Sequence, residues 1–233
     1  MLKLLKKETM YEANHGWLES RFHFSFGEYR NFDNMNFGVL RVLNDDIIYP
    51  KGGFGMHPHK DMEIISYIVK GSITHKDDMG NKECLKRGEV QYLSAGTGIE
   101  HSEFNDNKHE VLRLLQIWIL PPQKNMKPLY GSYKYTLQER KNRLLNIVSS
   151  QDSNAKVRLY QDANIYVSEL DKAKKLVFDI QKNRQIYFVC IEGSVSLNGM
   201  VMSEADAMEI TSESCLEIEA LENSHFLFIE MGV

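Results

Sequence analysis

Short runs of β-branched and aromatic residues, separated by turn residues, recur along the whole chain and constrain its fold more than any other feature. Turn signals separate most of them at spacings of roughly 8–12 residues, which is typical of an all-β sandwich or barrel. The dipeptide Asn198-Gly199 is the strongest short hairpin signal, and a helix is indicated only weakly, over 137–148. We therefore expect an all-β protein. Nine runs carry this prediction: FGVLRVL (37–43), EIISYIV (63–69), EVQYL (89–93), VLRLLQIWIL (111–120), NIYVSEL (164–170), KLVFDI (175–180), IYFVCI (186–191), LEIEA (216–220) and HFLFIEM (225–231).

A faint internal repeat and a proline-rich break divide the chain. VKGSIT (69–74) resembles IEGSVS (191–196) position by position, and LPPQKNMKP (120–128) holds three of the five prolines. With 233 residues there is material for two such units. The sequence predicts a first β-unit over residues 1–122 and a second over 123–233.

Two histidines flank a proline in the segment GFGMHPHKDMEII (53–65). In a strand, His57 and His59 would point to the same face, where two imidazoles can converge on one ion. Pro58 cannot donate to a β-ladder, so this segment is expected at a sheet edge or bulge, where there is room for a ligand.

A second pair of potential ligands, His101 and Glu103, stands in SAGTGIEHSEFN (94–105), again at positions i and i+2 behind glycines. Together the two pairs supply three nitrogens and one oxygen. That set suits a divalent metal such as Fe(II), Ni(II), Cu(II) or Zn(II), and an octahedral ion held by four ligands keeps two open positions. Glycines Gly96 and Gly98 are expected to allow close approach of the backbone to the metal.

The second half has no histidine pair at the positions that correspond to His57 and His59. Counting from Gly193 with the offsets that join Gly71 to the first histidine pair leads to Asp179 and Gln181. We therefore expect one metal ion per chain, held by the first unit only.

Charge and cysteine usage narrow the class of protein. The formal net charge of −4 does not indicate binding to nucleic acid or to a membrane surface. No apolar run in the sequence is expected to span a bilayer. The three cysteines, Cys84, Cys190 and Cys215, are widely spaced and odd in number. They predict packed thiols in a reducing cytoplasm instead of disulfides.

Several other polar residues have simpler interpretations. His23 alternates with phenylalanines and is expected to occupy a surface-facing position of a strand. His75, close to Asp77, either makes hydrogen bonds in a loop or orients a metal ligand. The pair Asp45-Asp46 is interpreted as a solvated turn.

The order and spacing of these motifs resemble those of a known protein family. The chain resembles the cupin motif pair at His57, His59, Glu63, Gly88, His101 and Asn105. It resembles the pirin family more closely, densely in the first half and thinly in the second, through NHGWLESRFHFSF (14–26), GFGMHPHKDMEI (53–64), THKDDMGN (74–81), LSAGTGIEHSEFN (93–105) and LLQIWILP (114–121).

The resemblance implies a bicupin fold, with two jelly-roll-like β-barrel units and iron in the N-terminal one. The family's ligands fall on His57, His59, His101 and Glu103. General cupins often use the carboxylate at the position of Glu63, which is the alternative ligand here.

The resemblance also implies two functions of different classes. Bacterial pirin-like proteins include quercetin 2,3-dioxygenases, which open a flavonol ring with O2 and release carbon monoxide; Glu103 would then be both ligand and general base. Phe54, Met56 and Ile99 are candidates for the wall of the substrate pocket, or for plain core. Other pirins resemble iron-dependent adaptors that bind transcription or metabolic proteins, where the same ligands would sense the oxidation state of the metal.

Overall fold

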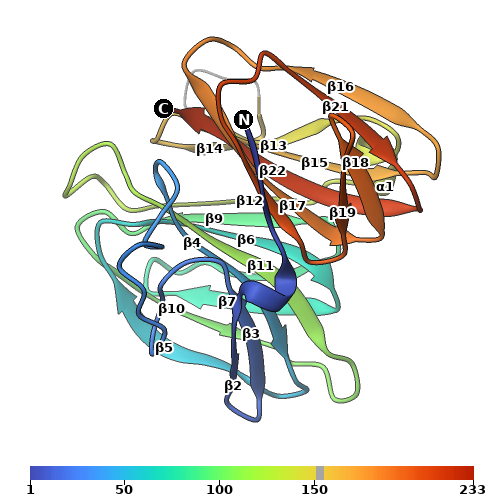
Figure 1. Cartoon of the computed structure of the whole chain (residues 1–233). Helices are drawn as coiled ribbons and strands as arrows, with labels where there is room; N and C mark the ends of the chain where they lie inside the picture. The colour runs from blue at the N-terminus through green and yellow to red at the C-terminus, as the bar shows by residue number, and fades with distance from the viewer. Residues whose placement is uncertain (151–154) are drawn as a thin grey trace. The chain divides into compact units, whose positions relative to one another are not determined.

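The computed structural model describes residues 1–150 and 155–233 and divides them into two β-units. The N-terminal unit comprises Tyr11–Lys134 and Lys156–Gln161; the C-terminal unit comprises Met1–Met10, the described part of Tyr135–Ala155, and Asp162–Val233 (Figure 1). The predicted ranges, 1–122 and 123–233, differ from this division in three places. Residues 123–134 and 156–161 lie in the N-terminal unit, and the first ten residues contribute a strand to the sheet of the C-terminal unit.

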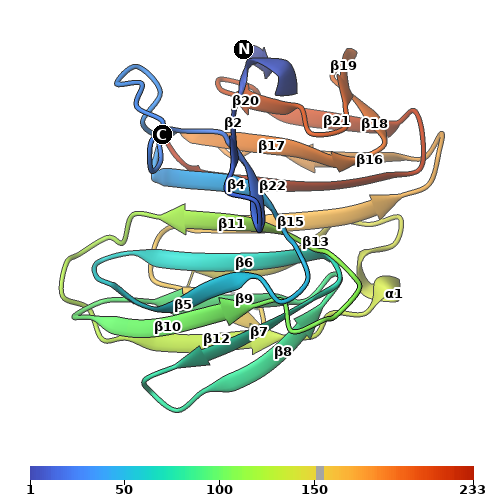
Figure 2. The same cartoon turned by 90° about the horizontal axis from the view of Figure 1, so that it is seen from below.

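Two antiparallel sheets form the N-terminal unit (Figure 2). Side chains from both sheets pack together in its core. The large sheet has the order β12-β9-β6-β11-β4-β3-β2 and the small sheet the order β5-β10-β7-β8. The strands are β2 (Tyr11–Asn14), β3 (Leu18–Phe22), β4 (Leu40–Ile48), β5 (Gly53–His59), β6 (Glu63–Lys70), β7 (Ser72–Asp77), β8 (Lys82–Lys86), β9 (Val90–Ser94), β10 (Ile99–Phe104), β11 (Leu112–Ile119) and β12 (Leu129–Tyr133), with β14 (Val157–Leu159) in the later segment.

The C-terminal unit repeats this architecture. Its large sheet includes the order β1-β20-β17-β22-β15-β13, and its small sheet has the order β16-β21-β18-β19. Its elements are β1 (Leu2–Leu5), the short 3-10 helix η1 (Lys7–Thr9), α1 (Leu137–Arg140), β13 (Leu145–Ser150), β15 (Ala163–Leu170), β16 (Lys175–Asp179), β17 (Arg184–Glu192), β18 (Ser194–Leu197), β19 (Met200–Ser203), β20 (Ala207–Ile210), β21 (Cys215–Ala220) and β22 (Ser224–Gly232).

Two turns fix the correspondence between the units. Gly71 joins β6 to β7 and Gly193 joins β17 to β18, each with a positive φ, of 72° and 80°. A Cβ on either glycine would overlap a backbone carbonyl of a neighbouring loop, so both the space and the φ require glycine. The repeat noticed in the sequence is therefore a repeated strand–turn–strand unit. The predicted hairpin at Asn198-Gly199 is also present, because Leu197 pairs with Met200 across a two-residue turn.

A polar band crosses the interior of the N-terminal unit between two apolar clusters. One cluster includes Ile68, Ile73 and Leu114; the other includes Ile64 and Ile99. The side chains between them are polar although buried, among them Ser66, Gln91, His75, His101 and Glu103. On β6 the change occurs within one face, where Ile64, Ser66 and Ile68 succeed one another at every second residue.

Four sequence expectations are wrong in detail. Asp45 and Asp46 are buried residues of β4 and not a solvated turn, and His23 is only 4% exposed although it was expected at the surface. Of the cysteines, all free, only Cys190 is buried; Cys84 is exposed and Cys215 is partly so. The weakly indicated helix is one short turn, α1, followed directly by a loop and β13.

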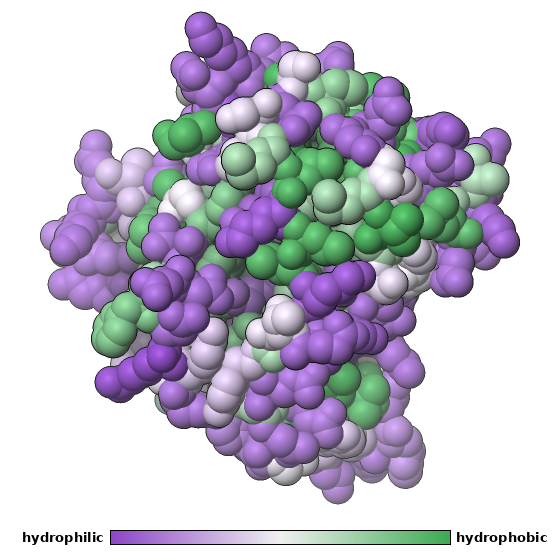
Figure 3. Space-filling view, in the orientation of Figure 1, coloured by the Kyte–Doolittle hydropathy of each residue, from purple (hydrophilic) through white to green (hydrophobic). Residues whose placement is uncertain are grey.

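The face drawn in Figure 3 is mostly hydrophilic, with hydrophobic residues gathered in limited patches. Among the described residues, no helix has the length and apolar character needed to cross a membrane.

Candidate metal centre

Three histidines meet where β5 pairs with β10. His57 lies opposite His101 in the antiparallel ladder, and His59 follows two residues after His57 on the same strand. The ring centroids are 4.7 Å apart for His57 and His59, 4.5 Å for His57 and His101, and 4.9 Å for His59 and His101. One nitrogen of each ring lies within 4.8 Å of one nitrogen of the others. Three imidazoles can therefore share one ion.

Close approach of β5 to β10 brings these rings together. A Cβ on Gly53 would overlap the carbonyl oxygen of Glu103, so the start of β5 can approach β10 only because this residue is glycine. The ladder also shifts register between His101 and Glu103, so β5 has one residue more than β10 across this interval. In contrast, the close approach at Gly96 is to the backbone of Met126, and we therefore assign it a structural reason instead of the expected approach to a metal.

Burial keeps two of the imidazoles neutral. It lowers the pKa of His101 to about 3, with smaller contributions from His57 and His75. It also lowers the pKa of His59 to about 4, helped by His101 and His57. A neutral imidazole has a free lone pair, which a metal requires.

Hydrogen bonding leaves at least one ring nitrogen of His57 and of His101 free to bind a metal ion. His57 donates from Nδ1 to the carbonyl oxygen of Gly55 at 2.7 Å, which leaves Nε2 with its lone pair. Neither ring nitrogen of His101, which is 1% exposed, has a hydrogen-bond partner among the described residues. Burying an unpartnered polar group is costly unless something binds it. This residue therefore fits a metal ligand better than a structural histidine.

Glu103 adds a buried carboxylate next to His101. Its Oε1 accepts hydrogen bonds from Ser66 Oγ at 3.0 Å and from Gln91 Nε2, and its Oε2 accepts one from Gln116 Nε2 at 2.8 Å. A carboxylate offers about four acceptor positions, so one remains. Ser66, Gln91 and Gln116 lie side by side on β6, β9 and β11, opposite one another in the ladders, and hold the carboxylate in place.

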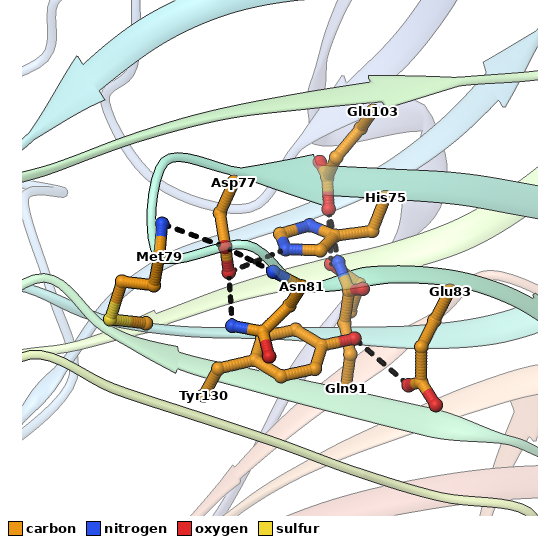
Figure 4. Close-up of polar contacts among 9 residues, drawn as sticks. His75, Asp77, Met79, Asn81, Glu83, Gln91, Glu103 and Tyr130 are labelled. Carbon is orange, nitrogen blue, oxygen red and sulfur yellow. Dashed lines mark hydrogen bonds and ion pairs between the residues drawn. The ribbon is translucent and has the colours of Figure 1, made fainter.

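His75 forms a second grouping with His101 and Glu103, in which one potential ligand atom of each lies within 4.8 Å of the others. Figure 4 shows His75 between Asp77 and Tyr130. Its Nε2 lies 3.2 Å from Asp77 Oδ2, and its ring stacks on Tyr130 at 4.7 Å. Burial raises the pKa of Asp77, but hydrogen bonds from Asn81 and His75 outweigh it, so the net pKa is lowered. His75 is thus a fully buried, oriented residue of the site and not a loop histidine.

The alternative ligand Glu63 is engaged elsewhere. Its carboxylate accepts hydrogen bonds from Tyr92 Oη at 2.7 Å and from the backbone N–H groups of Tyr160 and Gln161 at 2.7 and 3.0 Å. It belongs to neither of the histidine groupings found among the described residues. Its role here is to bind the segment Lys156–Gln161 within the N-terminal unit.

The three residues expected to form a pocket wall lie in different surroundings. Phe54 packs edge-to-face on Trp17 and its ring centroid lies 6.1 Å from that of His57. Ile99 is buried in the cluster with Ile64, whereas the side chain of Met56 is 54% exposed. Phe54 is therefore the one that adjoins both the histidines and a cavity, described below.

The donor set fits a single divalent metal ion. The three histidines form one grouping, and Glu103 joins His101 and His75 in a second, so nitrogen and oxygen donors of the kind that first-row transition metals prefer lie together. Sequence reasoning missed the residues that hold the carboxylate, Ser66, Gln91 and Gln116. The available signal was a polar residue at a core-facing position of an otherwise apolar strand, as in EIISYIV and VLRLLQIWIL.

Comparisons with known proteins identify similar sequences and structures. The family model for pirin matches residues 5–119, and the model for the quercetinase C-terminal cupin domain matches residues 146–231. The chain is 39% identical to the quercetin 2,3-dioxygenase of Escherichia coli, covering 99% of both chains, and 39% identical to the pirin-like protein of Caulobacter vibrioides, covering 94% of both.

A crystal structure of the Escherichia coli protein YhhW superposes with a TM-score of 0.94 at 38% identity, covering 99% of this chain and 97% of that one. A second structure, of the bacterial pirin YhhW in complex with nickel(II), gives a TM-score of 0.93 at 37% identity, covering 100% and 99%. With its two β-units, its buried histidine and carboxylate site and these relatives, the chain belongs to the pirin family and has the bicupin fold.

Proposed function

We propose that this protein is a metal-dependent dioxygenase that opens the flavonol ring of quercetin with O2 and releases carbon monoxide. The observation that carries the proposal is His101, whose two buried nitrogens have no hydrogen-bond partner within the described part of the chain, next to two further histidines. The names of relatives at 39% identity over nearly the whole chain support the choice of substrate.

In this proposal His57, His59, His101 and Glu103 hold one ion, for which we propose Fe(II), with copper, nickel or zinc as alternatives. A bound ion of this kind supplies Lewis acidity toward a phenolic oxygen and open positions for small ligands. The half-buried His57 and His59 form the accessible side of the site, and the buried His101 forms its base.

Glu103 is suited to take the proton of the flavonol hydroxyl. Three of its roughly four acceptor positions are already used, so the remaining one can serve the ion or the proton but not both at once. The donors from Ser66, Gln91 and Gln116 fix the carboxylate, which limits the movement needed between these two roles.

A turnover assay tests the proposal. Iron-loaded protein should consume O2 and quercetin in equal molar amounts and release carbon monoxide. The loss of quercetin is followed by its absorbance. His101→Ala should abolish both signals, whereas His109→Ala, which changes an exposed histidine outside the site, should leave them unchanged. A protein that binds one metal per chain but consumes neither quercetin nor O2 would exclude this activity and favour the regulatory alternative.

A further inference from the structure

A cavity of 380 Å³ lies within the N-terminal unit, bordered by strands β3, β4 and β5. Its size falls within the range of about 300–1,000 Å³ typical of small-molecule sites. Aromatic rings make up much of its wall, and the half-exposed side chains of His15 and Glu28, 3.5 Å apart, lie at its rim. The lining residues are His15, Trp17, Leu18, Ser20, Phe22, Phe26, Gly27, Glu28, Asn44, Asp46 and Phe54.

Three aromatic contacts, in two separate paths, join the cavity to the histidines. Phe54 lines the cavity and its ring lies 6.1 Å from that of His57. Phe26, on another wall, packs edge-to-face on Trp118 at 5.3 Å, and Trp118 packs on His59 at 5.0 Å. A planar molecule in the cavity would therefore be separated from the nearest histidine of the candidate metal centre by one aromatic ring, that of Phe54.

Three polar residues of the cavity lie on the neighbouring strands β3 and β4. Ser20 pairs with Asp46, and Phe22 pairs with Asn44, in the ladder between β3 and β4. Ser20 donates its hydroxyl to Asp46, so these two groups satisfy each other. Burial raises the pKa of Asp46 to about 7, which reduces its charge near neutral pH.

Asn44 is different, because its side-chain oxygen is buried and has no hydrogen-bond partner anywhere in the described residues. The residue is 3% exposed and lines the cavity. It also lies opposite Gln116, which donates to the candidate ligand Glu103. A buried carbonyl oxygen without a donor is unfavourable, and a hydroxyl group entering the cavity would satisfy it.

We propose that this cavity binds a planar polyhydroxylated aromatic molecule beside the metal centre, and that Asn44 Oδ1 accepts a hydrogen bond from one of its phenolic hydroxyls remote from the metal. This rests on the proposed function for the position of the reacting edge. Asn44 is then a specificity residue for hydroxylation of the substrate, and Phe22, Phe26 and Phe54 supply an apolar slot for its rings.

Anaerobic titration of the full-length, iron-loaded protein with two probes tests the proposal. Quercetin carries several hydroxyls, whereas 3-hydroxyflavone keeps only the one next to the carbonyl. Asn44→Leu should weaken quercetin binding about tenfold, as expected for a lost hydrogen bond that leaves a hydroxyl buried. The same variant should leave 3-hydroxyflavone binding unchanged. Phe54→Ala should weaken the binding of both probes.

Two further variants protect the test. Asn146→Leu changes an asparagine of the C-terminal unit whose buried side-chain oxygen also has no partner in the described residues, and it should alter neither affinity. Asn44→Ala removes the same oxygen without adding a branched side chain, and it replaces Asn44→Leu if that variant is misfolded by circular dichroism.

Equal effects of the Asn44 variants on both probes, or no effect on either, would overturn the proposal. Because O2 is absent, binding is measured without turnover. Quercetin binding that depends on Asn44, in a protein that shows no O2 uptake in air, would refute the proposed reaction and leave the cavity assignment standing.

Discussion

The two units have the same strand order, but a polar band crosses the interior of the N-terminal unit, whereas the corresponding interior of the C-terminal unit is apolar. Both place a strand–glycine–strand turn at the same point, and β10 pairs with β7 in the same register as β21 with β18. The C-terminal unit nevertheless fills every position of the candidate metal centre with an apolar side chain. By strand pairing, Phe178, Leu216, Leu197 and Ile218 occupy the positions of His57, His101, His75 and Glu103, and Ile180 occupies that of His59.

The layer beneath shows the same substitution. Ser66, Gln91 and Gln116 hold the Glu103 carboxylate, whereas Phe188, Met208 and Phe228 occupy the equivalent positions on β17, β20 and β22. In the C-terminal unit these side chains form one continuous apolar cluster with Leu216 and Ile218.

The comparison separates what the fold requires from what the site requires. An apolar interior is sufficient to hold these sheets together, since the C-terminal unit has one. The polar band of the N-terminal unit contributes less to stability, because buried polar groups are costly unless they are bonded. Its presence therefore indicates function located in a site on a shared fold.

The largest expected effect comes from moving the carboxylate across. Ile218→Glu places a charge in an apolar cluster without the donors that surround Glu103, and we expect it to lower the free energy of unfolding by about 3–5 kcal/mol. The converse variant, Glu103→Ile, should fold and lose metal affinity. Urea denaturation and elemental analysis measure the two outcomes. An unchanged stability of Ile218→Glu would show that the C-terminal interior accepts charge.

Truncating equivalent positions should give different phenotypes in the two units. Leu216→Ala should lower the free energy of unfolding by about 2–5 kcal/mol and leave one metal ion per chain. His101→Ala should remove the metal and, in metal-free protein, cost less stability, because it deletes a buried group without a partner. If both variants retain one ion per chain, the assignment of His101 as a ligand is wrong.

The two buried glutamates of the N-terminal unit should behave differently. Glu103→Gln should weaken metal binding at least about tenfold, comparable to the loss of a group that supports metal ligands. Glu63→Gln should leave the affinity unchanged, because Glu63 is bonded to Tyr92 and to the backbone of Tyr160 and Gln161. Competition with a chelator measures both affinities. The opposite ranking would make Glu63 the ligand.

Among the residues of the two histidine groupings, the smallest effect is expected at His75, where the comparison is least decisive. His75→Leu copies the residue of the C-terminal unit, and we expect the metal to remain with an affinity lowered by less than about tenfold, because His75 is already held by Asp77 and Tyr130. Loss of the ion in this variant would show that His75 is itself a metal ligand.

Much of the fold could be predicted from the sequence, because the strands are long and strongly β-forming. All nine predicted runs overlap strands. The predictions failed where a polar residue is buried by tertiary contacts. Asp45 is paired with Arg113, 68 residues away in the sequence, and Asp46 with Ser20 on the neighbouring strand, and neither contact has a local signal.

The candidate site shows the same limit. The two pairs of ligands were apparent from their spacing, since i and i+2 residues share a face of a strand. The equivalent residues in the second half were misplaced by one, to Asp179 and Gln181 instead of Phe178 and Ile180. Counting from a turn cannot reveal that the connection after Ile180 is one residue longer than the one after His59, and a shift of one exchanges the two faces of a strand.

The pairing of β1 with β20 has a consequence for how the chain is made. Leu2 pairs with Ile210, so the first strand and its partner are about 200 residues apart. At a synthesis rate of about 5–20 residues per second, β1 waits roughly 10–40 seconds before β20 leaves the ribosome. The sheet of the C-terminal unit therefore includes a strand that is synthesised about 200 residues before its partner, and a change at Leu2–Leu5 would affect a sheet whose other strands are made much later.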